Sequence, residues 1–416
     1  MFKFIPGSLR QYSNLPKSIY VLFLSNIINK MGNFVVPFLT LYLTHNLKFS
    51  ADKVGFLIMI ASGFYLPGSL LGGKLVDKYG RKSILLISQS LSALFFIPCV
   101  IYPYSPSSAY FIYGNVFFTA MADPAYVSMT TDLSHKNNRN EVFSLLYIGS
   151  NIGTAIGPLL AGYLFNKYVR WLFIGNIISI LLSIYLIYRF VPETIGNISN
   201  LELDDNNINT EEKAEEKGFL KAFFNRPTLI IFAIVSIIFS FTHAQSLFAL
   251  PLQVTDTFGV EGSKLFGYVI ATNAIVVVTL TSFLTNRTKN LNPIINVALG
   301  GVFYFLGFGM LYYIKTPLLF ILSSILWTSG EILVFTNQSV YIVSKTPITH
   351  RGRFNSVMPL ITGIGRAFGP AIMGKFIALT EIKAAWLLIM VLISIASMTM
   401  YTLYLFEKGK ASAKIS

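Results

Sequence analysis

Five ionisable residues stand inside long apolar stretches of this chain. They are two acids, one histidine and two bases: Asp123, Glu331, His243, Lys30 and Arg366. An unpaired charge at the centre of a bilayer costs about 3 kcal/mol, so such residues usually face a watery cavity or each other. Acids and a histidine there can take up and release protons, and the bases can bind or neutralise negative groups. The pattern indicates proton transfer beside a charged binding site.

The polar neighbours of these residues recur with helical spacing. Asn26, Lys30 and Asn33 follow one another at i, i+4 and i+7, on one face of a helix. Similar stripes accompany the other ionisable residues, together with aromatic residues that suit an amphipathic substrate. We therefore expect a substrate cavity that includes Lys30, Asn26, Asn33, Tyr126, Trp327, Gln338 and Arg366.

Three residues are candidate proton carriers. Glu331 is the first choice, because desolvation near mid-membrane raises the proton affinity of a carboxylate. Asp123 follows closely, since Pro124 bends the helix next to it and frees a carbonyl group. His243 titrates in the right range, although a histidine among serines is as often a hydrogen-bonded core residue. The alternative is that the bases only neutralise the acids in structural ion pairs.

The composition predicts the elements that carry these residues. Of 416 residues, 54% are hydrophobic and 12% are charged, and the mean hydropathy is +0.62. A soluble protein carries roughly 25% charged residues. Apolar runs of about 20 residues indicate transmembrane helices. We expect twelve of them, near residues 18–45, 52–76, 83–104, 108–133, 141–165, 169–190, 228–256, 263–285, 293–314, 317–345, 352–378 and 383–406.

The basic residues predict the orientation in the membrane. The net charge of +14 comes mainly from Lys and Arg in alternate short loops, which places both termini in the cytoplasm and argues against a nucleic-acid partner. The single Cys99 excludes an internal disulfide, and no metal or cofactor pattern is present. The expected location is a cell membrane, either the bacterial inner membrane or a plasma membrane.

An internal repeat predicts two halves. At a constant offset of 212 residues, seven residues in and just before the fifth predicted span recur around the eleventh, including a Gly-Pro pair. Two six-helix bundles of parallel repeats are a known transporter architecture. We expect bundles at 1–191 and 228–416, joined by a polar cytoplasmic linker at 192–227.

The loop after the second predicted span reads GKLVDKYGRK, from Gly73 to Lys82. It resembles the signature loop of the major facilitator superfamily, whose fold is an all-α pair of six-helix bundles related by a pseudo-two-fold axis. Gly73 permits close helix approach and Gly80 a tight turn. The resemblance implies a cytoplasmic latch that closes the inner side, with the residues Gly73, Asp77, Gly80, Arg81, Asp132 and Arg139. The alternative is a basic loop that only sets orientation.

The fifth predicted span carries small residues at four-residue spacing. Gly153, Gly157, Pro158 and Gly162 resemble the motif that marks proton-driven antiporters of this superfamily, in its twelve-span drug:proton group. Ala161 stands where the motif has a further glycine. A general helix-packing face is the alternative, and the copy on the eleventh span favours it.

The resemblance implies a proton-coupled transporter that works by alternating access, uses the proton gradient and needs no cofactor. The first hypothesis is a monomeric antiporter that exports small amphipathic or drug-like molecules. The second is a proton symporter for a sugar, an organic anion or a short peptide, which the bases Lys30 and Arg366 favour. A lipid flippase is the third. We do not expect an enzyme, since the four histidines are scattered without catalytic or metal-binding spacing.

Overall fold

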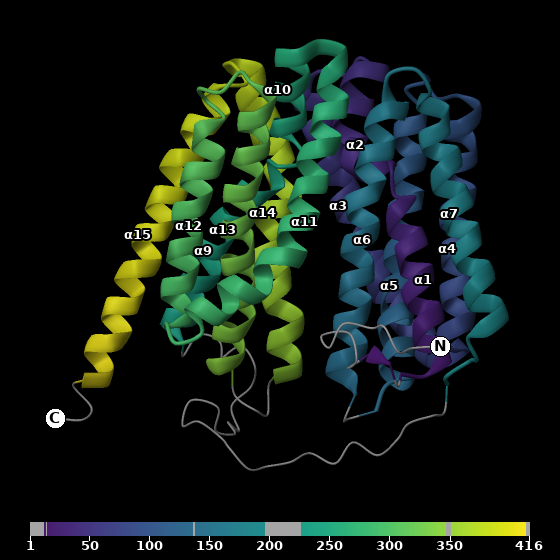
Figure 1. The fold of residues 1–416 in the computed structure, drawn as a ribbon, viewed down its shortest axis with the longest axis horizontal. Helices are drawn as coiled ribbons and strands as arrows, with labels where there is room; N and C mark the ends of the chain where they lie inside the picture. Colours follow the sequence, from purple (N-terminus) through teal and green to yellow (C-terminus); the bar gives the residue numbers. More distant parts are fainter. Residues whose placement is uncertain (1–11, 14, 136–137, 196–225, 347–350, 413–416) are drawn as a thin grey trace. The chain divides into compact units, whose positions relative to one another are not determined.

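The computed structural model describes residues 12–13, 15–135, 138–195, 226–346 and 351–412, and every regular element in these ranges is helical. The first half contains α1 (Lys17–Met31), α2 (Val35–Leu41), a π-helical turn (Tyr42–Asn46), α3 (Ala51–Tyr79), α4 (Arg81–Ile101), α5 (Ser108–Asp132), α6 (Arg139–Phe165) and α7 (Val169–Phe190). The second contains α9 (Pro227–Ala244), α10 (Ala249–Phe258), a 3-10 turn (Gly259–Glu261), α11 (Gly262–Thr288), α12 (Pro293–Met310), α13 (Pro317–Ser344), α14 (Arg351–Leu379) and α15 (Ala384–Ser412) (Figure 1).

Many of these helices are long enough to cross a membrane. Within the described residues, nine helical segments meet the length and hydropathy of a span, and one of them, 62 residues long, contains α9, α10 and α11. Neither α5 nor α14 is among the nine. The number of twelve spans therefore stays a prediction, and most of the predicted linker, residues 196–225, lies outside the described residues.

Proline explains two breaks inside predicted spans. Pro37 lacks the N–H that would bond to the carbonyl of Asn33, and the chain leaves the helix between α1 and α2 at that point. Pro251 likewise lacks the N–H that would bond to the carbonyl of Leu247, and the chain turns there between α9 and α10. Each proline lies in the first turn of the following helix, where a missing N–H is tolerated.

The contacts divide the chain into two compact units. Unit 1 comprises Met1–Phe49, Ile60–Leu201 and Phe258–Ile275, and unit 2 comprises Ser50–Met59, Glu202–Thr257 and Val276–Ser416. The first nine residues of α3 thus belong to unit 2, and the first fourteen of α11 belong to unit 1. The predicted boundaries at 1–191 and 228–416 stay a prediction.

Each unit has its own helix packing. In unit 1, α1 lies against α6 and α7, and α4 lies against α5 and α7 (Figure 1). In unit 2, α12 lies against both α13 and α15, and α9 lies against α14. The ring of Phe308 stacks on Trp327 of α13 and on Trp386 of α15, with ring centroids 5.5 and 5.9 Å apart.

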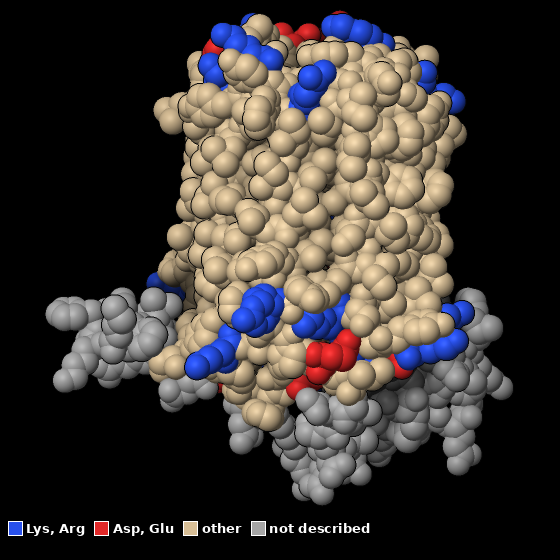
Figure 2. Space-filling view, turned by 90° about the vertical axis from the view of Figure 1, so that its right-hand side faces the viewer, with Lys and Arg blue, Asp and Glu red and all other residues tan. Residues whose placement is uncertain are grey.

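The charged residues are distributed as expected for a protein that spans a membrane. On the face drawn in Figure 2, Lys, Arg, Asp and Glu gather toward the two ends, and the broad band between them shows none. Many large apolar side chains of these helices are exposed, among them Leu70, Tyr188 and Leu318. An exposed apolar band between charged ends is the surface expected next to lipid.

Candidate functional site

Unit 1 contains a cavity of about 320 Å³. Its wall is built from α1, α4, α5, α6 and α7. Polar side chains make up much of the lining: Ser25, Asn26, Asn29, Lys30, Gln89, Asp123, Tyr126, Thr130, Tyr147, Ser150 and Ser183. Three of the predicted cavity residues, Asn26, Lys30 and Tyr126, are among them, and the predicted Asn33 is not.

Lys30 reaches the cavity from the last turn of α1. Gly153 of α6 sets its position, because a Cβ atom on Gly153 would lie 2.6 Å from the Cβ of Lys30. The neighbouring Gly157 packs in the same way on the carbonyl of Met31. Within the described part of the chain, no hydrogen bond or ion pair engages the Lys30 ammonium group. Its charge therefore remains available to a molecule in the cavity.

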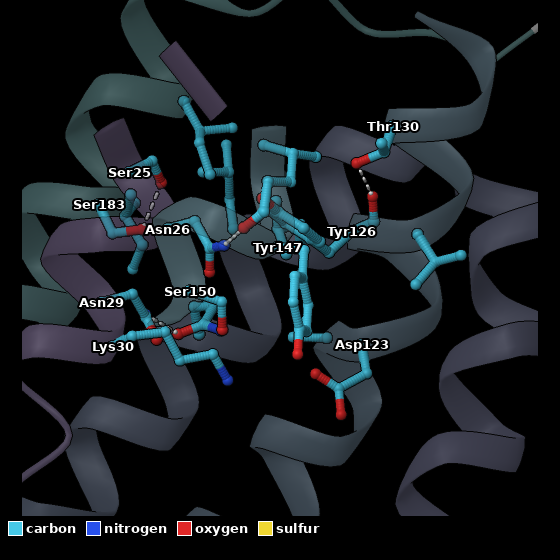
Figure 3. A pocket seen from close by; sticks show the side chains of 18 of the residues that line it. Ser25, Asn26, Asn29, Lys30, Asp123, Tyr126, Thr130, Tyr147, Ser150 and Ser183 are labelled. Carbon is cyan, nitrogen blue, oxygen red and sulfur yellow. Dashed lines mark hydrogen bonds between the residues drawn. The ribbon is translucent and has the colours of Figure 1, made fainter. Parts of the chain in front are cut away.

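Asp123 reaches the cavity from the middle of α5. Its Oδ2 accepts a hydrogen bond from the hydroxyl of Tyr65, on α3, at 2.7 Å. Lys30 acts on it electrostatically, but no ion pair between the two is found among the described residues. Figure 3 shows Lys30 and Asp123 on opposite sides of Tyr147, with their charged ends directed into the same space.

The remaining polar groups give the cavity a neutral hydrogen-bonding wall. Asn26 donates to the carbonyl of Leu146 at 2.9 Å, which leaves its side-chain oxygen toward the cavity as a possible acceptor. Asn29 donates to Gln89 at 3.4 Å. Such a wall can bind polar parts of a ligand while the two charges provide orientation.

The other predicted ionisable residues form a second cluster, in unit 2. The guanidinium of Arg366 lies 5.7 Å from the ring centre of Phe335, and the ring of His243 meets Phe335 edge-on at 5.1 Å. Nδ1 of His243 lies 3.5 Å from the hydroxyl of Tyr304. Glu331 is half-buried and acts electrostatically on Tyr304, as Arg366 also does.

Two further predicted residues lie buried in unit 2. Trp327 is 1% exposed and Gln338 is 6% exposed. The indole Nε1 of Trp327 and the amide Nε2 of Gln338 have no hydrogen-bond partner among the described residues. In unit 2 the structure thus places His243 and Arg366 against Phe335, and Trp327 against His243.

Two of the predicted latch residues, Arg81 and Asp132, meet where α4 begins. Nε of Arg81 forms an ion pair with Oδ2 of Asp132 at 3.0 Å. Arg139 instead donates to Ser134 at 3.3 Å. Asp77 is exposed and forms no side-chain hydrogen bond or ion pair within the described residues.

Glu193 completes this cluster, and sequence reasoning missed it. Its Oε1 accepts from the backbone N–H groups of Arg81 at 2.9 Å and Lys82 at 3.2 Å, and its Oε2 accepts from that of Ser83 at 3.2 Å. The carboxylate therefore caps the start of α4. Beside it, the hydroxyl of Thr194 donates to Asp132 at 2.9 Å. The signal in the sequence was an acid directly after Pro192, where the predicted span ends.

Of the two glycines of the loop, Gly80 has the expected role and Gly73 does not. Gly80 has φ of +100°, so it makes the predicted tight turn. A Cβ on Gly73 would meet nothing within 4 Å, so Gly73 makes no close helix approach in this structure. The neighbouring Gly72 makes the close helix approach instead, against the carbonyl of Met121 on α5. A helix turns about 100° per residue, so the two glycines face different directions.

The small residues of α6 also divide between two partners. Gly153 and Gly157 face α1, whereas Pro158 and Gly162 face the start of α11. A Cβ on Gly267 of α11 would lie 2.5 Å from the carbonyl oxygen of Pro158.

Unit 2 repeats this contact at the offset of 212 residues. There, Gly55 of α3 packs against the carbonyl of Pro370, and Gly374 of α14 packs against the carbonyl of Ala51. We name the two contacts the Gly-Pro joints. The Gly-Pro pairs found in the sequence therefore lie at equivalent contacts, one in each unit.

The resemblance of the loop from Gly73 to Lys82 pointed to one family of membrane proteins. The family model of the Major Facilitator Superfamily matches residues 22–370. The chain belongs to this superfamily. It is a multi-pass membrane protein of the transporter class, as the sequence predicted.

Individual relatives are distant. The uncharacterised transporter YqjV of Bacillus subtilis is 22% identical over 374 residues, 88% of each chain. A protein of Planococcus maritimus named as a Na(+), Li(+), K(+)/H(+) antiporter is 25% identical over 366 residues, 81% of this chain and 84% of the relative. The crystal structure of a POT family transporter with a thioalcohol-conjugated peptide has a TM-score of 0.77 at 14% identity and covers 95% of this chain and 96% of the other. At that identity the likeness shows the fold alone.

Proposed function

We propose that the chain is a proton-coupled antiporter that exports small amphipathic or drug-like molecules by alternating access. The observation that carries this proposal is the Asp123 carboxylate, which lines the polar cavity of unit 1 and accepts a hydrogen bond from the hydroxyl of Tyr65. A carboxylate in that position can bind a proton or a positively charged group of a substrate.

Competition between a proton and a substrate for the Asp123 carboxylate couples export of the substrate to entry of the proton. A proton and a cationic group each neutralise Asp123, so the presence of one weakens the binding of the other. When the cavity opens inward, the substrate displaces the proton, and when it opens outward, a proton displaces the substrate. Tyr126 and Tyr147 supply aromatic surface for the apolar part of such a molecule. The antiporter from Planococcus maritimus among the relatives supports exchange with protons.

We place Asp123 before Glu331 as the proton carrier, which reverses the order expected from the sequence. Asp123 lines the described cavity and lies within the electrostatic range of Lys30. Glu331 is half-buried beside the aromatic cluster of unit 2. We assign Glu331, His243 and Arg366 a secondary role in charge balance during the cycle.

The test is transport by purified protein in liposomes with an imposed proton gradient and ethidium as the probe. We expect ethidium to move against its gradient as protons flow the other way. Asp123→Asn cannot change charge, so proton-driven transport of ethidium is lost in this variant. Asp52→Asn, an exposed acid at the start of α3, is the matched control and keeps wild-type transport. Normal coupled transport by Asp123→Asn contradicts the proposal.

Lys30 favours a second candidate, a proton symporter for an anionic nutrient. Its ammonium group faces the same cavity without a described partner, and an anion bound to it would favour a protonated Asp123. Proton and substrate would then bind together and move in the same direction. Uptake of a labelled organic anion that rises with inward proton flow, and that Lys30→Gln abolishes, would support symport over antiport.

We propose a cell-membrane location with both termini in the cytoplasm, since Lys and Arg are concentrated in the corresponding loops. We further propose that Arg81, Asp132 and Arg139 act with the Gly80 turn as an inner latch. The Arg81–Asp132 ion pair at 3.0 Å supports this role.

A further inference from the structure

The helices α3 and α5 meet through one face of α3. Gly68 packs against the carbonyl of Phe117, and Gly72 packs against the carbonyl of Met121. Tyr65 precedes these glycines by three and seven residues, so it shares their helix face. From this face the hydroxyl of Tyr65 reaches Asp123 of α5.

The hydrogen bond between Tyr65 and Asp123 connects α3 to the cavity. None of the described lining residues belongs to α3. The hydroxyl of Tyr65 nevertheless reaches Oδ2 of Asp123 at 2.7 Å. A phenol that donates to a carboxylate forms a charge-assisted bond, which is about twice as strong as the bond between neutral groups.

We propose that Tyr65 is the positioning residue of the proton site: its hydroxyl stabilises ionised Asp123 and fastens α3 to α5, and protonation of Asp123 loosens α3. This inference rests on the proposed function, in which Asp123 takes up the proton. It adds the route by which a proton in the cavity acts on a helix outside it.

The Tyr65–Asp123 hydrogen bond holds the middle of α3, and other contacts hold its two ends. Residues Ala51–Met59 of α3 belong to unit 2, where Gly55 contributes to a Gly-Pro joint, and the rest of the helix belongs to unit 1. The helix ends at Tyr79, next to the Gly80 turn that Glu193 contacts. When the Tyr65–Asp123 hydrogen bond weakens, the segment of α3 between these two ends is held less firmly.

Several other polar groups line the same cavity as Asp123 and must be kept constant in a test. They are the ammonium of Lys30 on α1, and the phenols of Tyr126 on α5 and Tyr147 on α6. A substitution of Tyr65 leaves all three in place. Tyr65→Phe removes the hydroxyl while keeping the ring.

Tyr113 provides a matched control in the same helix interface. Its ring, on α5, stacks on Phe64 of α3 with centroids 5.4 Å apart. Its hydroxyl is buried and has no hydrogen-bond partner among the described residues. Tyr113→Phe therefore deletes the same atom from the same pair of helices without removing a bond to Asp123.

The experiment is an infrared titration of the full-length protein in liposomes, which needs no substrate. The band of the protonated carboxyl that disappears in Asp123→Asn reports Asp123. We expect its titration midpoint to move to higher pH by about one unit in Tyr65→Phe, since ionised Asp123 loses a charge-assisted bond. The midpoint in Tyr113→Phe stays at the wild-type value.

Hydrogen–deuterium exchange tests the loosening of α3. In the wild-type protein, the protection of residues 60–72, which is the intrinsic amide exchange rate relative to their observed rate at the same pH, is lower below the Asp123 midpoint than above it. In Tyr65→Phe their protection is low on both sides. Two results overturn the inference. One is an unchanged Asp123 midpoint in Tyr65→Phe, and the other is a protection of α3 in the wild-type protein that is the same above and below that midpoint. Either result leaves the proposed function standing, because only intact coupling in Asp123→Asn contradicts that.

Discussion

At the scale of single residues, Glu193 shows how one carboxylate can organise a helix end. Burial alone would raise the pKa of Glu193, but hydrogen bonds from the backbone N–H groups of Lys82, Thr194, Ser83 and Arg81 outweigh it and keep the pKa below its ordinary value. The folded state therefore favours the ionised form. The same carboxylate contacts Gly80, where any side chain would meet it.

We predict that Glu193→Gln lowers the thermal stability of the purified protein at pH 7, by about 1 kcal/mol for the loss of a charged helix cap. Because the folded pKa lies below the unfolded value of about 4.3, this contribution is present above that pH and is lost as the pH falls through the folded pKa. Unfolding followed by tryptophan fluorescence at pH 7 and at pH 3.5 measures it.

The control is Glu261→Gln, an exposed acid paired with Lys264 at 2.9 Å. An exposed ion pair three residues apart contributes little, so the melting temperature should not change. If Glu193→Gln and the wild-type protein unfold alike at pH 7, the cap does not stabilise α4.

At the scale of helices, the Gly-Pro joints are the repeated contact of the fold. In unit 1 the start of α11 packs on α6, and in unit 2 the start of α3 packs on α14. Each joint places a glycine directly on the carbonyl of a helix proline. A proline leaves the carbonyl four residues earlier without a donor and bends the helix, which gives these helices a fixed shape for their partners.

We predict that Gly267→Val and Gly55→Val each impair the protein, because the new side chain collides with the carbonyl of Pro158 or Pro370. Overpacking of this kind costs about 1–3 kcal/mol. Melting temperature and ethidium transport in liposomes measure the loss.

Gly63→Val is the control on α3, since a Cβ there would meet nothing within 4 Å. If Gly63→Val and Gly55→Val had equal melting temperatures, the Gly-Pro joint of unit 2 would contribute nothing to the stability of the protein.

At the scale of the whole molecule, charge distribution sets the orientation in the membrane. The sequence predicts that the α11–α12 loop is cytoplasmic and that the α12–α13 loop is external, because Lys and Arg are concentrated on the side of the first. Lys289 and Lys315 are exposed in these two loops, on either side of α12.

We predict that, in a Cys99→Ser background, a membrane-impermeant maleimide added to intact cells labels Lys315→Cys but not Lys289→Cys. Both variants should be labelled after the cells are opened, which serves as the control for exposure. Labelling of Lys289→Cys alone in intact cells would reverse the orientation.

Much of the chemistry could be predicted from the sequence. The apolar runs indicated the membrane helices, and the loop from Gly73 to Lys82 pointed to the superfamily that the family model confirms. Of the residues named from the stripes around Lys30 and Asp123, Asn26, Lys30, Asp123 and Tyr126 line one cavity and Asn33 does not, and their role in transport stays a prediction. Periodicity succeeds here because a helix in a membrane must turn its polar residues away from lipid.

By itself, then, the sequence determined that the protein is a membrane protein, because this follows from composition and apolar runs along one chain, and the resemblance of its Gly73–Lys82 loop indicated the superfamily. Only the tertiary structure decided which helices the charged side chains meet. Tyr65 reaches Asp123 across 58 residues, and Glu193 reaches Arg81 across 112. Such contacts depend on how one helix backbone packs on another, and a pattern read along a single helix does not contain that information.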